Sequence, residues 1–147
     1  MRVFLDTNVL ASAVATRGLC ADVLREVLSS HELLISAKVL SELRRVLKTK
    51  FAVAPDLIDD ITALLRQDTL IAEPEELLQL AIKDQADLVI LSAALAANAE
   101  AFVTGDNELL ELGQVRNLSI ISPRQFWDCL KARPRRGTAR RKRRPSR

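Results

Sequence analysis

Short apolar runs alternate along this chain with longer segments in which apolar residues recur at helical spacing. The runs that are short enough to be buried strands lie at residues 3–5, 33–35, 69–71, 101–104 and 118–121. Helical spacing marks residues 21–29, 39–47, 56–67, 84–97 and a last segment that opens at Ser122-Pro123. Strands that alternate with helices in this way form a parallel sheet covered by helices on both faces.

We therefore predict an α/β fold with three layers, α/β/α, around a five-stranded parallel sheet in the order 3-2-1-4-5. In such a sheet, sites lie outside the carboxyl ends of the strands where the strand order reverses, here between the first and fourth strands. Aromatic residues make up only 3% of the chain, so Leu, Val, Ile and Ala must fill the core. This composition favours an α/β or all-α fold over a β-sandwich.

The positive charge of the chain is concentrated at its C-terminal end. Residues 133–147 hold nine of the 22 Lys and Arg residues and none of the 19 Asp and Glu residues. The remaining 13 basic and 19 acidic residues give residues 1–132 a net charge of −6. We predict one globular domain over residues 1–131 and a disordered basic tail over 132–147, because so charged a segment cannot pack.

Several classes of protein are disfavoured. No apolar run reaches the roughly 18 residues of a membrane span, and the N-terminus lacks a signal-peptide pattern, so we expect a cytoplasmic protein with no membrane association. Cys20 and Cys129 are too few for a disulfide framework or a cysteine zinc site, and we expect both to be core thiols. His31, the one histidine, is expected on a surface loop and argues against a Ser-His-Asp triad.

Four acidic residues are expected at the switch point. Asp6 ends the first strand and Asp106 follows the fourth. Asp87 lies on the inward face near the start of its helix, and Glu42 borders the apolar stripe of another. Since helices of this fold begin at the carboxyl edge of the sheet, the four carboxylates converge.

Four converging carboxylates need a counter-charge. Two unit charges about 4 Å apart repel by about 4 kcal/mol at an effective dielectric of about 20. Either the pKa values rise or a cation lies among the carboxylates. Oxygen ligands select a hard ion, Mg²⁺ or Mn²⁺, and such an ion suits phosphodiester hydrolysis because it activates water and neutralises charge on the phosphate.

Each acid also has a purely structural interpretation. Asp6 can cap a helix, and Asp87 can be favoured by the dipole at the start of its helix. Glu42 can pair with Lys38 or Arg45 on its own helix, and Asp106 can belong to a turn. These alternatives account for the residues one at a time. The metal-site hypothesis instead explains why all four fall at one edge of one sheet.

The chain resembles PIN-domain nucleases, in particular the bacterial toxins of toxin–antitoxin pairs. The resemblance spans roughly residues 1–131 and rests on LDTNVL at 5–10, SELRRVL at 41–47, DLVILSAAL at 87–95, VTGDNELL at 103–110 and ISPRQFWDCL at 121–130. It implies a Rossmann-like sheet, dependence on Mg²⁺ or Mn²⁺, an RNA substrate, an antitoxin partner and a homodimer.

The resemblance also implies roles for individual residues. Asp6, Glu42, Asp87 and Asp106 fall on the acidic positions of the family. Asp6 and Asp106 would bind the metal directly, Asp87 would be a ligand or support one, and Glu42 would hold a water on the metal. Asn8 and Thr104 match polar positions that support such sites.

The main hypothesis is therefore a metal-dependent endoribonuclease, the toxin of a toxin–antitoxin pair. An alternative is a non-catalytic module that binds nucleic acid through the basic tail. The tail residues that would contact phosphates are Arg135, Arg136, Arg140, Arg141, Lys142, Arg143 and Arg144. A phosphatase or receiver with Asp6 as nucleophile is disfavoured, because Asn8 stands where a phosphatase needs its second acid.

Overall fold

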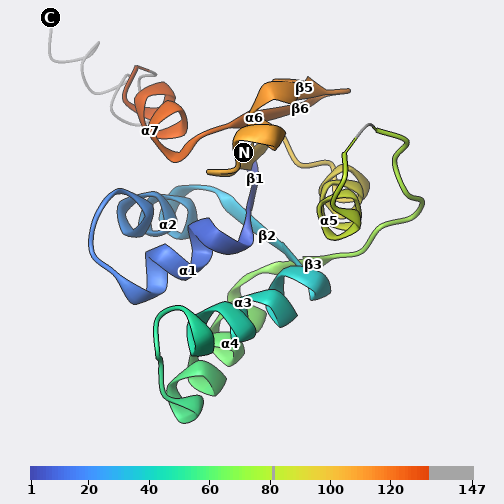
Figure 1. Ribbon diagram of the computed structural model, residues 1–147. Helices are drawn as coiled ribbons and strands as arrows, with labels where there is room; N and C mark the ends of the chain where they lie inside the picture. Colours follow the sequence, from blue (N-terminus) through green and yellow to red (C-terminus); the bar gives the residue numbers. More distant parts are fainter. Residues whose placement is uncertain (81, 133–147) are drawn as a thin grey trace, which may run out of the picture.

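The computed structural model describes residues 1–80 and 82–132, and it contains one six-stranded sheet (Figure 1). In chain order the strands are β1 (Arg2–Leu5), β2 (Glu32–Ser36), β3 (Leu70–Ala72), β4 (Ala101–Val103), β5 (Gln114–Val115) and β6 (Leu118–Ile121). The five apolar runs of the sequence correspond to β1, β2, β3, β4 and β6. Each of the five predicted strands is therefore present.

Strand β1 lies inside the sheet and pairs in parallel with β2 on one side and β4 on the other. Strand β3 pairs in parallel with β2, and β6 with β4. The full order is β3-β2-β1-β4-β6-β5, so the five parallel strands follow the predicted order. The switch point therefore lies between β1 and β4.

The sheet has one strand more than predicted. Strand β5 has two residues and pairs antiparallel with β6 at the edge of the sheet. It consists of the exposed Gln114 and the half-buried Val115. Two residues, of which one is polar, form no apolar run that would mark a strand in the sequence. The chain reverses after it through Arg116, whose φ of 53° is left-handed.

Helices lie on both sides of the sheet. In Figure 1, α1, α2 and α7 lie on one side and α5 on the other, while α3 and α4 form a pair whose α3 also contacts α1. The helices are α1 (Thr7–Ala15), α2 (Leu19–Ser30), α3 (Ala37–Thr49), α4 (Pro55–Asp68), α5 (Gln85–Ala96), α6 (Asn107–Leu112) and α7 (Pro123–Ala132). This arrangement agrees with the predicted α/β/α architecture.

The core is built on the two central strands. Phe4 of β1 and Phe102 of β4 are opposite each other in register, both are fully buried, and their rings stack with centroids 5.3 Å apart. Burial of side chains of this size contributes about 1.5–3 kcal/mol each. The strands that carry Asp6 and Thr104 at their carboxyl ends are therefore deeply buried.

Polar side chains begin several helices directly after the strands. Ser36 ends β2 and its Oγ accepts a hydrogen bond from Val39 N–H at 3.1 Å, which starts α3. Asp6 starts α1 after β1, and Asp106 starts α6 after β4. These caps satisfy N–H groups that a first helical turn leaves free. As a result, the carboxyl edge of the sheet is lined with helix N-termini.

Two predictions about single residues can be compared with the structure. Cys20 is half-buried, but Cys129 is exposed on α7 rather than in the core, because Phe126 is the one residue that this helix buries. His31 ends α2 and is half-buried, with its ring edge-on to Phe126 at 6.3 Å. Within residues 1–80 and 82–132, no helix is long and apolar enough to cross a membrane.

Candidate active site

Asp6 is the buried acid of the site. Only 8% of its surface is exposed. Its Oδ1 accepts a hydrogen bond from Thr7 N–H at 2.8 Å, and its Oδ2 accepts one from the Thr104 hydroxyl at 2.7 Å. Burial raises the pKa of Asp6, the two hydrogen bonds lower it, and the charges of Glu42 and Asp106 raise it further. Asp6 is therefore both the N-cap of α1 and a carboxylate held in place from two sides.

Thr104 joins Asp6 to Asp106. It is fully buried directly after β4, and while its hydroxyl donates to Asp6 it accepts a hydrogen bond from Asp106 N–H at 3.0 Å. Asp106 in turn caps α6, because its Oδ1 accepts from Glu108 N–H at 2.8 Å. The carboxyl ends of β1 and β4 are thus linked by one hydroxyl group at the switch point.

Glu42 reaches the same edge from α3. Its Oε1 accepts a hydrogen bond from the Thr7 hydroxyl at 3.0 Å. Thr7 is buried and directly follows Asp6 in the chain. The interpretation of Glu42 as a partner of Lys38 or Arg45 on its own helix is not what the structure shows, since its hydrogen bond crosses from α3 to α1.

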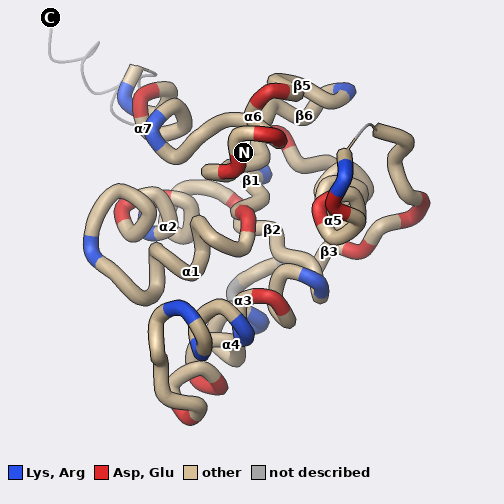
Figure 2. The backbone as a smooth tube through the Cα atoms, in the orientation of Figure 1, with Lys and Arg blue, Asp and Glu red and all other residues tan. Residues whose placement is uncertain are grey.

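Asp87 completes the set from the first turn of α5. Its pKa is raised to about 7, first by partial burial and then by the negative charges of Asp84, Asp6, Asp106 and Glu42. Each of the other predicted acids therefore lies within electrostatic reach of Asp87. The structure brings all four together, and Figure 2 shows acidic positions at the starts of α1, α5 and α6 and on α3.

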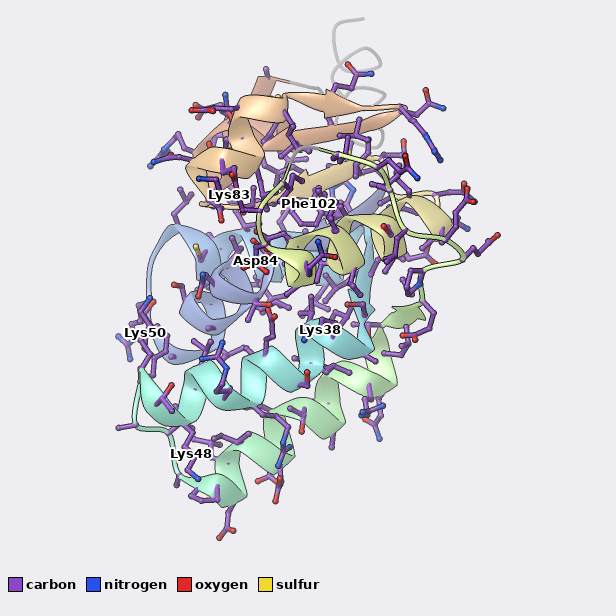
Figure 3. The ribbon with its side chains drawn as sticks, turned by 45° about the vertical axis from the view of Figure 1, so that its right-hand side comes forward. Lys38, Lys48, Lys50, Lys83, Asp84 and Phe102 are labelled. Carbon is purple, nitrogen blue, oxygen red and sulfur yellow. The ribbon has the colours of Figure 1, made fainter. Side chains whose placement is uncertain are left out.

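Asp84 is a further acid of this edge, which was not predicted from the sequence. It caps α5 through a hydrogen bond of 2.8 Å from Ala86 N–H to its Oδ1, and its charge is the largest carboxylate contribution to the raised pKa of Asp87. Figure 3 shows it where α5 begins, close to Lys83. Its spacing of three residues from Asp87, on the same first turn, is a signal in the sequence that points to it.

The remaining predicted residues have different outcomes. Asn8 is exposed in the first turn of α1, and no hydrogen bond of its side chain to another described residue is present, so its supporting role stays a prediction. The seven basic residues predicted to contact phosphates, from Arg135 to Arg144, lie outside the described residues. The tail predicted over 132–147 lies there as well, except for Ala132, which is the last residue of α7.

The donor chemistry of this edge fits a hard divalent cation. Its side chains offer carboxylate and hydroxyl oxygens, which Mg²⁺ and Mn²⁺ prefer. In the described part of the chain, no three His, Cys, Asp or Glu side chains are already arranged to hold an ion directly. Mg²⁺ keeps several of its waters and binds proteins through one or two carboxylates, so this arrangement suits a hydrated ion beside Asp6.

The fold and the acidic switch point define a class of α/β proteins with an oxygen-rich site at the carboxyl edge of a mostly parallel sheet. The sequence model of the PIN domain matches residues 2–108, which include all five acids of this edge. The chain therefore belongs to the PIN domain family, whose members are generally nucleases. No curated protein sequence matches it.

Two solved structures share the fold. One is VapBC2 from Rickettsia felis bound to a DNA fragment from its promoter, with a TM-score of 0.58 and 21% identity over 83% of this chain and 98% of that one. The other is VapBC-1 from nontypeable Haemophilus influenzae, with a TM-score of 0.57 and 20% identity over 84% of this chain and 98% of that one. At these identities the likeness concerns the fold.

Proposed function

We propose that the chain is a metal-dependent endoribonuclease and the toxin of a toxin–antitoxin pair. The observation that carries this proposal is the hydrogen-bonded series at the switch point. Glu42 accepts a hydrogen bond from Thr7, the residue that follows Asp6. The Thr104 hydroxyl donates to Asp6 and accepts from the backbone of Asp106. Three elements distant in sequence thereby present carboxylates at one edge. Such an arrangement is unfavourable without a cation, since like charges repel.

Asp6 and Asp106 are proposed to hold Mg²⁺ or Mn²⁺, with Asp87 as a further ligand or support. When bound, the ion supplies Lewis-acid chemistry, because it lowers the pKa of a water and offsets charge on the phosphate. Glu42 is proposed to accept a hydrogen bond from the attacking water and to orient it toward phosphorus. The hydroxyl of Thr104 orients the Asp6 carboxylate and that of Thr7 orients the Glu42 carboxylate. Little reorganisation of these two groups is then needed when substrate binds.

The toxin assignment is supported by family membership and by the shared fold with the two VapBC structures. We expect an antitoxin protein to bind and inhibit this chain, and we expect the chain to form a homodimer. Induced expression of the wild-type chain should arrest growth in a bacterial host, whereas Asp6→Asn should not. Equal arrest by both would contradict a toxicity that depends on the acidic site.

The direct test is RNA cleavage by purified protein with Mg²⁺ or Mn²⁺. We expect cleavage by the wild-type chain, loss of cleavage in EDTA and recovery when the ion is restored. Asp6→Asn should be at least about 100-fold slower, because it removes a proposed ligand while Asn remains a good N-cap for α1. Asp128→Asn, an exposed acid on α7, makes the same charge change away from the site and should cleave normally.

Two outcomes would contradict the proposal. Full activity of a correctly folded Asp6→Asn protein would exclude the acidic edge as the site of chemistry. Tight RNA binding by the wild-type chain without any cleavage in either ion would instead favour the alternative of a non-catalytic binding module. Equilibrium binding measured beside the cleavage assay separates these results.

A further inference from the structure

Helix α3 has a basic face beside the acidic edge. Glu42 is the one acid in the helix, and it borders the buried stripe. The solvent side of α3 instead carries Lys38, Arg44, Arg45 and Lys48, and Lys50 follows the helix. Figure 3 shows Lys38 at the start of α3 and Lys48 and Lys50 at its end. Cations near the C-terminus of a helix are favoured by its dipole.

The C-terminal half of this face opens into a cavity between α3 and α4. The cavity has a volume of about 470 Å³. The described residues that line it include three cations and no acid: Arg44, Arg45, Lys48, Thr49, Pro55 and Ile58. We call this cavity the α3–α4 groove. Its basic lining contrasts with the net charge of −6 on residues 1–132.

The cations of the groove differ in their partners. Arg44 is fixed, since its guanidinium donates to Asp59 at 2.6 Å and to Thr62 at 3.1 Å. Arg45 and Lys48 are exposed, and within the described part of the chain neither side chain has a hydrogen bond or an ion pair. Their charges are therefore available to an external anion, whereas the charge of Arg44 is partly offset by Asp59.

Helix α3 carries both Glu42 of the proposed site and cations that line the groove. Arg45 lies one turn after Glu42 on the same side of α3, and Lys48 follows it. At a rise of about 1.5 Å per residue, these positions are displaced from Glu42 by about 4.5 and 9 Å along the helix axis. Successive phosphates of one strand are about 3.4 Å apart along a stacked duplex, so this span corresponds to one to three nucleotides.

We propose that the α3–α4 groove binds the phosphate backbone of the RNA one to three nucleotides from the bond that is cut, through Arg45 and Lys48. This inference rests on the proposed function, since it places the groove relative to the cleavage site. A body of net charge −6 repels RNA, and the groove supplies a local positive surface next to the acidic edge. Because its contacts are to phosphates, it holds and positions RNA of any sequence.

The test compares two charge-matched double variants of the full-length chain. Arg45→Gln/Lys48→Gln neutralises the groove, and Arg124→Gln/Lys131→Gln removes two exposed cations from α7. Each protein binds a short single-stranded RNA in EDTA, where cleavage is blocked, over a range of salt concentrations. Each phosphate contact contributes about 0.7 to the slope of log K against log salt. The groove variant should therefore lose about 1.4 from the slope, while the α7 variant should bind as wild type.

If the two proteins bind equally at about 1 M salt, this slope corresponds to about 25-fold weaker binding by the groove variant at about 0.1 M. A neutral methylphosphonate placed one to three nucleotides from the cleaved bond should weaken wild-type binding but have little further effect on the groove variant. Circular dichroism and thermal melting confirm that both variants fold.

An unchanged slope in the groove variant would overturn the inference, and so would an equal loss in the α7 variant, which would reflect net charge alone. Failure of the proposed function gives a different result. In that case the wild-type chain does not cleave RNA in Mg²⁺ or Mn²⁺, whatever the binding slopes are.

Discussion

Thr104 links two of the acidic residues at the edge of the sheet. It is fully buried, it donates to Asp6 and it accepts from the backbone of Asp106. A single hydroxyl thus links the Asp6 carboxylate, after β1, to the backbone of Asp106, after β4. Groups that orient metal ligands in this way typically change metal affinity or activity by about 10–100-fold when removed.

Replacing Thr104 with Val keeps the shape of the side chain and removes its hydroxyl. We expect RNA cleavage to fall about 10–100-fold and the free energy of unfolding to fall by about 1–3 kcal/mol, because two polar groups lose their partner. Thr104→Ser keeps the hydroxyl and should retain most of the activity. Cleavage rates and urea denaturation measure both effects, and equal activity of the Val and Ser variants would contradict this role.

Asp87 makes the stability of the metal-free protein depend on pH. Its pKa is raised from the ordinary value of 3.8 to about 7 in the folded chain, first by burial and then by neighbouring charges. The folded state therefore binds a proton more tightly than the unfolded state between these values. Stability is highest at low pH in this window and is lost as the pH rises toward 7.

Asp87→Asn removes this penalty. In EDTA at pH 8 we expect the variant to unfold at a higher urea concentration than the wild type, with a weaker dependence of stability on pH from about 4 to 7. Its RNA cleavage should nevertheless be reduced, since functional sites retain groups that cost stability. If Asp87→Asn is less stable than the wild type at pH 8, the charged Asp87 carboxylate does not destabilise the folded protein, and this prediction is wrong.

At the scale of elements, the site is assembled by helix caps. Asp6, Asp84 and Asp106 each begin a helix at the carboxyl edge, with Oδ1 bonded to a backbone N–H of that helix. The structural and functional interpretations of these acids are therefore compatible. Capping fixes one oxygen of the carboxylate and leaves the other for Thr104, as in Asp6, or for a ligand.

Two substitutions of Asp84 separate its cap from its charge. Asp84→Ala should lower the free energy of unfolding by about 1 kcal/mol, because α5 loses its N-cap. Asp84→Asn keeps a good cap and should leave the stability nearly unchanged, while the pKa of Asp87 falls toward its ordinary value. Urea denaturation and NMR titration of Asp87 measure the two effects. An equal loss of stability in both variants would contradict the capping role.

The sequence predicted the elements with strong patterns and missed those without. Buried parallel strands and amphipathic helices such as α3 have clear signatures. Helix α1 (Thr7–Ala15) was missed because it is apolar on most sides, with Val9, Leu10, Ala11 and Ala13 all buried, so no helical period stands out. Helix α6 has six residues and β5 has two, which is too short for a period to be read.

The convergence of the acidic residues was predictable for a related reason. Asp6 and Asp106 directly follow apolar strands, so the strand order alone brings them together. Asp84 was missed because it precedes the periodic part of α5 and is interpreted as a helix start. The hydrogen bonds through Thr7 and Thr104 depend on the side-chain geometry between strands, which no pattern along one segment reveals.

At the scale of the whole molecule, charge is divided between parts. Residues 1–132 carry a net charge of −6, and the last 15 residues carry nine positive charges. Within residues 1–132, the acidic edge lies beside the basic face of α3. Glu42 belongs to α3 and contributes its carboxylate to the acidic edge. We therefore expect two places on the body to attract an anionic polymer: the acidic edge when it holds a cation, and the α3–α4 groove.

The central claim is that the acidic edge holds a divalent ion that the chemistry requires. Anomalous diffraction from crystals of the full-length chain soaked in Mn²⁺ tests it most directly. We predict a peak between the carboxylates of Asp6 and Asp106, near Asp87, and no such peak in Asp6→Asn crystals soaked in the same way. The absence of density at this edge, at a Mn²⁺ concentration that supports RNA cleavage in solution, would contradict the account.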